Sequence, residues 1–428
     1  MNTILKSARL LDGSIVDIEI KEGKVVQIGQ NFEGKNVIDI DRNLLIPSLV
    51  DLHTHLREPG REDSETVATG ALAAVRGGYG AISPMANTTP VADTAGVVEQ
   101  VFALGKETGL CNVFPIGAVT HGLEGEKLAE LAAMNSSRAK VRIFSDDGKC
   151  VFDPLLMRRA LEYVKSFDGI IAQHAQEPRL TNGAQMNEGA ISSKLGLTGW
   201  PAVAEEAIIA RDILLAEHVN SKLHICHLTT AGGVELVRAA KARGVQVTAE
   251  VTPHHLLLTD DLIVGYDAIY KVNPPLRTSA DVMALRAGLA DGTIDIVATD
   301  HAPHPAEDKD CEWQAAAFGM IGLETALSVV VLAMIETGLI DWPTLVERMA
   351  TAPAKIAGYA GHGQAIEVGS SANFAVIDTS ASWTVDRNKM ASKSKNTPFH
   401  AMTLPSRVVK TIFNGELVFD ISKEGGAS

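Results

Sequence analysis

Two histidines follow the first long apolar run of the chain at a spacing that suits a metal ion. After residues 44–52 comes His53-Thr54-His55, and residues i and i+2 of an extended strand share a face. Both imidazoles then point the same way and form half of a zinc site, because imidazole nitrogen is a preferred ligand of this ion. Such a pair alone is equally compatible with ordinary hydrogen bonding, so its interpretation depends on further ligands.

Four more residues of ligand type stand at or just after the ends of later apolar runs: Asp147, His174, His227 and Asp300. In a (β/α)₈ barrel the carboxyl ends of the strands face one mouth, where all six side chains would converge. Four imidazole nitrogens and two carboxylates suffice for two zinc ions that share a bridging carboxylate. The sequence therefore predicts a zinc site with two ions, while occupancy by one ion stays open.

Neighbouring residues allow other assignments. Asp146 precedes Asp147 and could replace it as the bridging carboxylate. His224 points to the opposite face of an alternating strand from His227, so we expect it in the core or behind a ligand. His301 has no assigned role. The residues expected near the mouth but not on a metal are His254 and His255, which would orient ligands, and the thiols Cys150 and Cys226.

The order of elements predicts how these residues are held. Short apolar runs alternate with helix-like stretches, which is typical of parallel βαβ units and most simply of a closed (β/α)₈ barrel spanning residues 47–355. The runs are residues 44–52, 81–85, 113–119, 141–144, 170–174, 223–227, 245–251 and 294–298, and clear helix-like stretches are 64–75, 154–164, 202–216 and 233–242.

Both ends of the chain differ from this middle part. Residues 15–20 and 25–28 alternate around a turn, and Asn414-Gly415 separates two apolar runs, which is a strong hairpin signal. We therefore expect residues 1–46 and 356–428 to form one small β-sandwich domain built from both termini.

The composition limits the partners and the compartment. The chain has 428 residues and a net charge of −14, which argues against nucleic acid or an anionic membrane as the main partner. The most apolar segment, residues 320–340, is interrupted by Glu324 and Glu336 and predicts a buried helix rather than a membrane span. Four scattered cysteines without C-x-x-C spacing, and no signal-peptide stretch at the start, indicate a cytoplasmic protein.

Longer motifs, in order along nearly the whole chain, resemble those of bacterial type I dihydroorotases in the amidohydrolase superfamily. They are DLHTHLREPG (51–60), MANTTP (85–90), FSDDG (144–148), EVTPHHL (250–256), KVNPPLR (271–277), ATDHAPH (298–304), FGMIGLET (318–325) and SKSKNTPF (392–399). The resemblance implies the reversible cyclisation of N-carbamoyl-L-aspartate to dihydroorotate in pyrimidine biosynthesis.

The resemblance also implies roles for individual residues. It places His53, His55 and Asp300 on one zinc ion and His174 and His227 on the other, with Asp147 between them. It also implies that Asp300 takes a proton from the attacking water and gives it to the leaving nitrogen. The residues implied to hold the substrate carboxylate and ring are Arg57, Asn87, Asn273 and His304, together with the backbone of Phe318 and Gly319.

Two alternative functions compete with this interpretation. Related cyclic amidohydrolases, such as dihydropyrimidinases, hydantoinases and allantoinases, bridge their metals with a carbamylated lysine, but here that stretch contains Arg142, and Lys140 is offset. A catalytically inactive scaffold for aspartate transcarbamoylase would be expected to have lost ligands, and all six are present. We expect a homodimer that acts on a small molecule, and a complex with aspartate transcarbamoylase is compatible with this reading. The acidic loop 305–314 is a candidate for closure over the substrate.

Overall fold

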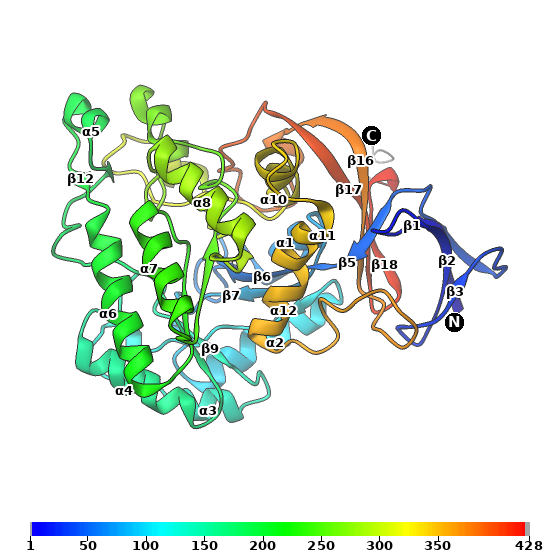
Figure 1. Cartoon of the computed structure of the whole chain (residues 1–428), viewed down its shortest axis with the longest axis horizontal. Coiled ribbons are helices and arrows are strands. Elements are labelled where there is room, and N and C mark those ends of the chain that lie inside the picture. The colour runs from blue at the N-terminus through cyan, green and yellow to red at the C-terminus, as the bar shows by residue number, and fades with distance from the viewer. Residues whose placement is uncertain (1, 424–428) are drawn as a thin grey trace.

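The computed structural model describes residues 2–423; the last five residues of the predicted C-terminal segment lie outside this range. Strands from both ends of the chain join in one sheet at one side of the molecule, beside a larger part in which strands and helices alternate (Figure 1). The strand order of the terminal sheet is β18-β17-β16-β5-β1-β2-β3, and β4 also pairs with β1. Its strands are β1 (Asn2–Arg9), β2 (Ile15–Lys21), β3 (Lys24–Gly29), β4 (Asn36–Asp39), β5 (Leu44–Pro47), β16 (Phe374–Thr384), β17 (Thr403–Phe413) and β18 (Glu416–Asp420).

The terminal strands confirm the alternation seen in the sequence. β2 and β3 pair antiparallel, as do β17 and β18 on either side of Asn414-Gly415. β5 joins the two ends of the chain, since it pairs with β1 on one side and with β16 on the other. The predicted run 44–52 is two strands rather than one, because β5 belongs to the terminal sheet and the chain passes through buried Ser48 before the next strand begins.

Eight parallel strands make up the second β structure. One sheet has the order β6-β7-β8 and another the order β9-β10-β13-β14-β15. Parallel bridges between Gly117 and Phe144, and between Thr54 and His301, connect the two sheets at both of their edges. The strands are β6 (Leu49–Thr54), β7 (Tyr79–Pro84), β8 (Asn112–Val113), β9 (Ile143–Phe144), β10 (Ile170–Gln173), β13 (Leu223–Ile225), β14 (Val247–Val251) and β15 (Ile296–Val297).

Helices follow most of these strands, as the alternation predicted. They are α1 (Val67–Arg76), α2 (Ala95–Thr108), α3 (Leu131–Ser136), α4 (Pro154–Lys165), α5 (Ala190–Leu195), α6 (Val203–Val219), α7 (Ala231–Ala242), α8 (Ser279–Asp291), α9 (Ala306–Lys309), α10 (Ala326–Val330), α11 (Trp342–Val346) and α12 (Ala352–Ala357). A short extra pair, β11 (Met186–Asn187) and β12 (Gly199–Trp200), lies in the loop before α6. Within residues 2–423, no helix has the length and apolar character needed to cross a membrane.

Helix α4 shows how the sequence fixes these elements. The Asp153 side chain accepts a hydrogen bond from the backbone of Leu156, and Pro154 occupies the first turn, where its missing N–H costs nothing. Met157, Leu161 and Val164 recur at a spacing of three or four residues and are buried. The helix therefore begins where the cap dictates and packs along one apolar stripe.

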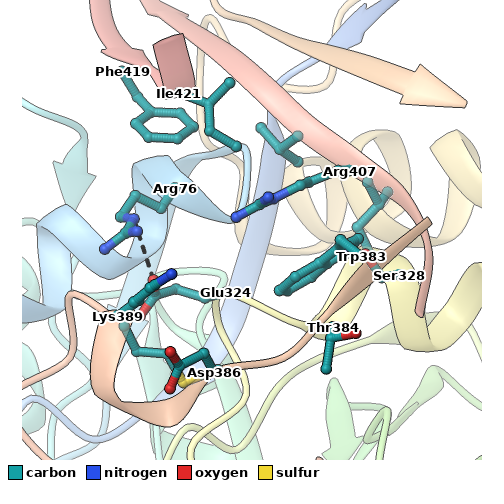
Figure 2. A pocket seen from close by; sticks show the side chains of 13 residues that line it. Arg76, Glu324, Ser328, Trp383, Thr384, Asp386, Lys389, Arg407, Phe419 and Ile421 are labelled. Carbon is teal, nitrogen blue, oxygen red and sulfur yellow. Dashed lines mark hydrogen bonds and ion pairs between the residues drawn. The ribbon is translucent and has the colours of Figure 1, made fainter. Parts of the chain in front are cut away.

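A small cavity of about 150 Å³ lies where the terminal sheet meets α1 and the segment before α10 (Figure 2). Arg76, at the end of α1, pairs with Glu324 at 3.3 Å, and Glu324 also accepts backbone hydrogen bonds from Ala391 and Ser392. Across the cavity, Arg407 of β17 lies 4.5 Å from the centre of the Trp383 ring. The hydrogen bonds from Ala391 and Ser392 to Glu324 fasten the segment between β16 and β17 to the part of the chain that carries the predicted metal ligands.

Candidate metal centre

The six predicted metal ligands lie together at the carboxyl ends of five parallel strands. His53 is in β6 and His55 directly after it, and the other four follow β9, β10, β13 and β15. Each is at most 5% exposed, so the cluster is almost completely buried. The six are His53, His55, Asp147, His174, His227 and Asp300.

Asp147 stands between two groups of imidazoles and turns a different oxygen toward each. Its Oδ2 lies 3.3 Å from Nε2 of His53 and 3.3 Å from Nε2 of His55. Its Oδ1 lies 3.2 Å from Nδ1 of His174 and 3.1 Å from Nε2 of His227. The donor atoms of each group are within 4.8 Å of one another. A single carboxylate is thus shared by two sets of donors.

Asp300 joins the first of these groups. Its Oδ1 lies 3.0 Å from Nε2 of His55 and 3.5 Å from Nε2 of His53. Within the described residues, buried Nε2 of His53 makes no hydrogen bond, although it points at both carboxylates. Imidazole nitrogens and carboxylate oxygens are ligands that zinc accepts. The residues present therefore fit a divalent metal on either side of Asp147.

The backbone bends sharply where the strands deliver these side chains. Arg57, His227 and Asp300 have φ angles of 62°, 29° and 46°, in the left-handed region that residues other than glycine rarely adopt. Such conformations persist only where the surrounding structure enforces them, and they cluster at functional sites. In each case the bend comes within three residues of the end of a strand.

The electrostatics of the cluster favour a cation at its centre. Burial opposes the charge on Asp147, but His53, His174 and His227 outweigh it and hold the pKa of this carboxyl well below its usual value. Burial likewise opposes ionisation of Asp300, yet His53 and His55 lower its pKa to about 2. In return, the carboxylates raise the pKa of His53 well above its usual value despite its burial. Positive charge, on a proton or a metal ion, is therefore held between the carboxylates.

Glu250, at the end of β14, supports the cluster from behind and was not assigned a role from the sequence. Its Oε1 lies 2.5 Å from Nδ1 of His53 and accepts a hydrogen bond of 3.2 Å from the backbone N–H of His227. Its Oε2 lies 3.0 Å from Nε2 of His224. A proton on Nδ1 of His53 leaves Nε2 free to act as the ligand atom. His224 thus contacts Glu250 rather than the centre of the cluster, in keeping with its predicted place behind a ligand.

Gln176 connects the metal cluster to a predicted substrate residue and was also not singled out from the sequence. Its Oε1 lies 2.8 Å from Nε2 of His174 and accepts a hydrogen bond of 3.3 Å from Nδ2 of Asn273. The only sequence signal was its position two residues after His174. The Oδ1 atom of Asn273 is buried and makes no hydrogen bond within residues 2–423, so this amide keeps an acceptor for a ligand.

The neighbouring candidates Asp146 and His301 are engaged in contacts outside the cluster. Asp146 accepts hydrogen bonds from the backbone of Val119 and Thr120 at 2.8 and 2.9 Å, which commits its carboxylate to a loop. His301 faces Glu65 at 3.3 Å. Cys226 lies beside His53 and Glu250, and burial raises the pKa of its thiol to about 12, so without a bound metal ion the thiol is protonated at neutral pH.

Of the other predicted neighbours, His255 lies 2.8 Å from the Thr252 hydroxyl and 3.1 Å from the Pro274 carbonyl, so it holds the loop that carries Asn273. His254 is buried beside it, and its Nε2 makes no hydrogen bond within the described residues.

The predicted substrate residues line the same region, on loops that follow the strands. Arg57 donates to the Pro303 carbonyl at 3.2 Å, and its Nη2 lies 3.4 Å from Nε2 of His304. His304 in turn lies 2.8 Å from the carbonyl of Phe318. Asn87 contacts the candidate ligand His55, since its Oδ1 lies 2.9 Å from Nδ1 of that imidazole. Burial, and next Arg57, lower the pKa of His304 to about 3, so His304 is neutral at physiological pH.

Gly319 completes this group and is held very close to His304. Its φ of +145° is one that other residues rarely adopt, and a Cβ atom there would lie 2.8 Å from Nε2 of His304 and 2.9 Å from Cβ of Ala302. Arg57, Asn87, Asn273, His304, Phe318 and Gly319 therefore lie around one region next to the metal cluster, and all remain candidates for substrate contacts.

Known proteins resemble this chain in sequence and in fold. A family model described as dihydro-orotase-like matches residues 42–232. A dihydroorotase from Streptomyces coelicolor is 63% identical over 416 residues, which is 97% of each chain, and one from Mycobacterium tuberculosis is 50% identical over 421 residues, 97% of this chain and 98% of the relative.

Among solved structures, an L-hydantoinase (dihydropyrimidinase) from Arthrobacter aurescens superposes with a TM-score of 0.86 at 25% identity over 98% of this chain and 96% of that chain. A dihydropyrimidinase from Brevibacillus agri superposes with a TM-score of 0.82 at 21% identity over 98% of this chain and 95% of that chain, a likeness of fold alone. With relatives this similar over nearly its whole length, the chain belongs to the dihydroorotase family.

Proposed function

We propose that this protein is a zinc-dependent dihydroorotase that catalyses the reversible cyclisation of N-carbamoyl-L-aspartate to (S)-dihydroorotate and water in de novo pyrimidine biosynthesis. The observation that carries the proposal is the Asp147 carboxylate, which offers one oxygen to His53 and His55 and the other to His174 and His227. This is the arrangement that a carboxylate shared by two zinc ions requires. Family membership at 63% identity supports the substrate.

We infer that the eight parallel strands form a closed (β/α)₈ barrel over residues 47–355 and that residues 1–46 and 356–428 form one small β domain, whose strands lie in a single hydrogen-bonded sheet and not in the two separate sheets of the expected β-sandwich. The barrel is supported by the bridges at Gly117–Phe144 and Thr54–His301, which give every strand two neighbours. The second domain is supported by a core in which Leu5, Ile18 and Phe374 from both ends of the chain are buried together. The active site would lie at the carboxyl ends of the barrel strands, as in other barrels of this kind.

The metal would be held by the six clustered residues, with His53, His55 and Asp300 on one side of Asp147 and His174 and His227 on the other. Bound zinc supplies a nucleophile from water at neutral pH and polarises the carbonyl of the substrate. Glu250 keeps Nε2 of His53 available by holding Nδ1, and Gln176 does the same for Nδ1 of His174 by holding Nε2. We favour two zinc ions per chain over one, since both sets of donors are complete.

The chain's own groups would bind the substrate and move the proton. Arg57 suits the substrate carboxylate, because a guanidinium can donate two parallel hydrogen bonds to it. Asn273 and the backbone of Phe318 and Gly319 would hold the ring edge. Asp300, with its pKa lowered to about 2, is ionised and can accept a proton at Oδ1 or Oδ2 before passing it to the leaving nitrogen.

The alternative of a hydantoinase-like bridge has little support from the residues. Lys140 lies before β9, at the strand end opposite Asp147, and Arg142 is committed to Asp168 at 2.7 Å. Neither can supply a carbamate beside the imidazoles. An inactive scaffold for aspartate transcarbamoylase is also disfavoured, because the full ligand set is present.

We further propose that the protein is cytoplasmic and forms a homodimer, and sedimentation of the purified protein would test the dimer. We also propose a complex with the transcarbamoylase, which co-purification would test.

The test of the activity is ring opening of dihydroorotate by purified protein, after chelation and again after zinc is restored, with hydantoin and allantoin in parallel. We expect chelation to abolish turnover, zinc to restore it, and dihydroorotate to be the preferred substrate. Turnover of hydantoin or allantoin instead would assign the chain to another cyclic amide, and no turnover by the zinc-loaded protein would refute the proposal.

A further inference from the structure

A lysine on the loop beside the site is buried and bound only to backbone carbonyls. Lys309 ends α9, and only 8% of it is exposed. Its Nζ donates to the carbonyl oxygens of Lys271, Ala317 and Gly319 at 3.0, 2.8 and 3.1 Å. Within residues 2–423 it makes no ion pair. Three acceptors match the three N–H groups of an ammonium, whereas a neutral amine has only two.

These three carbonyls belong to the two segments that we propose bind the substrate ring. Lys271 lies two residues before Asn273, and Ala317 and Gly319 flank Phe318. The segments also touch directly, since the N–H of Gly319 donates to the Lys271 carbonyl at 2.9 Å. The Lys271 carbonyl therefore accepts one hydrogen bond from the Gly319 N–H and one from Nζ of Lys309. Lys309 thus links the two segments where they meet.

The surroundings of Lys309 oppose the burial of its positive charge, which indicates that its hydrogen bonds to the two segments hold it in place. Burial lowers the pKa of Lys309 to about 7, and the charge of Lys271 adds to this effect, whereas Asp267 and Cys311 oppose it. Lys271 is also buried, and its Nζ donates to the Trp313 carbonyl at 2.6 Å and lies 4.4 Å from the centre of the Phe318 ring. Lys271 and Lys309 thus both bind backbone carbonyls of the segment 313–319 that carries Phe318.

We propose that Lys309 is a positioning residue for the substrate site: its ammonium fixes the segment around Asn273 against the segment Ala317–Gly319, so that both grip the same ring. This inference rests on the proposed function. Lys309 contacts none of the six metal-cluster residues, so its contribution is to binding of the substrate and not to binding of the metal. It also gives the loop 305–314 a defined role, because α9 carries the residue that ties the two segments together.

The test compares Lys309→Met with Lys165→Met. Lys309→Met keeps the length of the side chain but removes the donor from three carbonyls. Lys165, at the end of α4, donates to only one carbonyl, that of Val219, at 3.0 Å. We expect Lys309→Met to raise KM for dihydroorotate at least about tenfold, with a smaller fall in kcat and unchanged zinc content, since the carbonyls of Lys271, Ala317 and Gly319 lose the one donor that they share, and the segments can separate. Lys165→Met should leave KM unchanged. A KM for Lys309→Met within about twofold of the wild type would overturn the proposal.

Hydrogen exchange gives a readout that needs no substrate. In the wild type the Gly319 amide is protected by its bond to the Lys271 carbonyl. We expect peptides covering residues 271–273 and 317–319 to exchange at least about tenfold faster in Lys309→Met, while β10 exchanges at the wild-type rate. Unchanged exchange in both segments would overturn the positioning role. If the wild type fails to turn over dihydroorotate, the proposed function falls, while the exchange result still decides the role of Lys309.

Discussion

Replacing Glu250 by glutamine tests whether the cluster is a metal site whose zinc affinity depends on Glu250, which contacts the ligands but is not itself one of them. The amide has nearly the shape of the carboxylate, so Glu250→Gln removes the charge without opening a cavity. The change acts on three contacts of the carboxylate: one with Nε2 of His224 at 3.0 Å, and two that reach the cluster, with Nδ1 of His53 at 2.5 Å and with the backbone N–H of His227 at 3.2 Å. Because those two residues belong to different sides of Asp147, both parts of the metal site are affected.

The size of the effect follows from these two hydrogen bonds. A hydrogen bond to a charged group contributes about 1.5–3 kcal/mol and a neutral one about 0.5–1.5 kcal/mol, so each contact weakens by about 1 kcal/mol. Together they weaken by about 2 kcal/mol, which corresponds to a loss of about 30-fold in zinc affinity. This lies within the range of about 10- to 100-fold found when residues behind metal ligands are changed.

The assay is competition for zinc against a chromophoric chelator of known affinity, with zinc content measured after dialysis. The matched control is Glu324→Gln, another largely enclosed carboxylate, which is held by Arg76 and two backbone N–H groups and makes no hydrogen bond or ion pair with the six cluster residues (Figure 2). We expect the control to keep the wild-type affinity. If Glu250→Gln also bound zinc with the wild-type affinity, Glu250 would have no part in shaping the ligands, and the reasoning from its contacts would be refuted.

Three further changes test other parts of the molecule. Asp147→Asn should reduce bound zinc on both sides of the cluster with an unchanged circular dichroism spectrum, because an amide bridges two cations poorly; metal analysis that finds full loading would contradict a shared carboxylate. Arg57→Lys should raise KM for dihydroorotate about tenfold at unchanged zinc content, since an ammonium cannot donate the two parallel hydrogen bonds of a guanidinium; steady-state kinetics with an unaltered KM would exclude Arg57 from carboxylate binding. Burial lowers the pKa of His362 to about 4. Between pH 6.5 and about 4 this histidine is therefore protonated in the unfolded chain but not in the folded chain, and the free energy of unfolding falls by about 3 kcal/mol as the pH drops through this range. Denaturant unfolding of His362→Gln should lack this part of the acid sensitivity, and an equal pH dependence in both proteins would show that His362 is not buried as a neutral group.

The sequence was sufficient to predict that the six candidate ligands meet, because each follows an apolar run. The end of a strand in a parallel sheet has a fixed place in space, so the positions of Asp147 or Asp300 along the chain already imply where their side chains meet. Residue type then narrows the chemistry to a few metals. The prediction needed no knowledge of contacts between distant segments beyond the rule that parallel strands end at one face.

The supporting residues could not be predicted in the same way. Glu250 holds His53 across 197 residues of sequence, and nothing near it in the chain distinguishes it from a strand-end carboxylate that faces solvent. Lys309 lies among acidic residues, where a lysine is ordinarily exposed, and its burial depends on one carbonyl 38 residues before it and on two that lie eight and ten residues after it. The division of residues 44–52 into β5 and β6 was missed for a related reason, since two buried strands in direct succession read as one apolar run.

The structure separates the metal cluster from the groups proposed to hold the substrate, and this separation has a consequence. The cluster residues are at most 5% exposed and stand at strand ends, where packing of the strands fixes them. Arg57, Asn273, His304 and Phe318 lie on the loops that follow, and their positions depend on side chains such as Lys309 and His255. Loops can change without disturbing the strands that carry the metal. We therefore expect changes in the loops to alter which cyclic amide is bound while zinc content stays constant, and changes behind the cluster, as at Glu250, to alter zinc affinity with little effect on the choice of substrate.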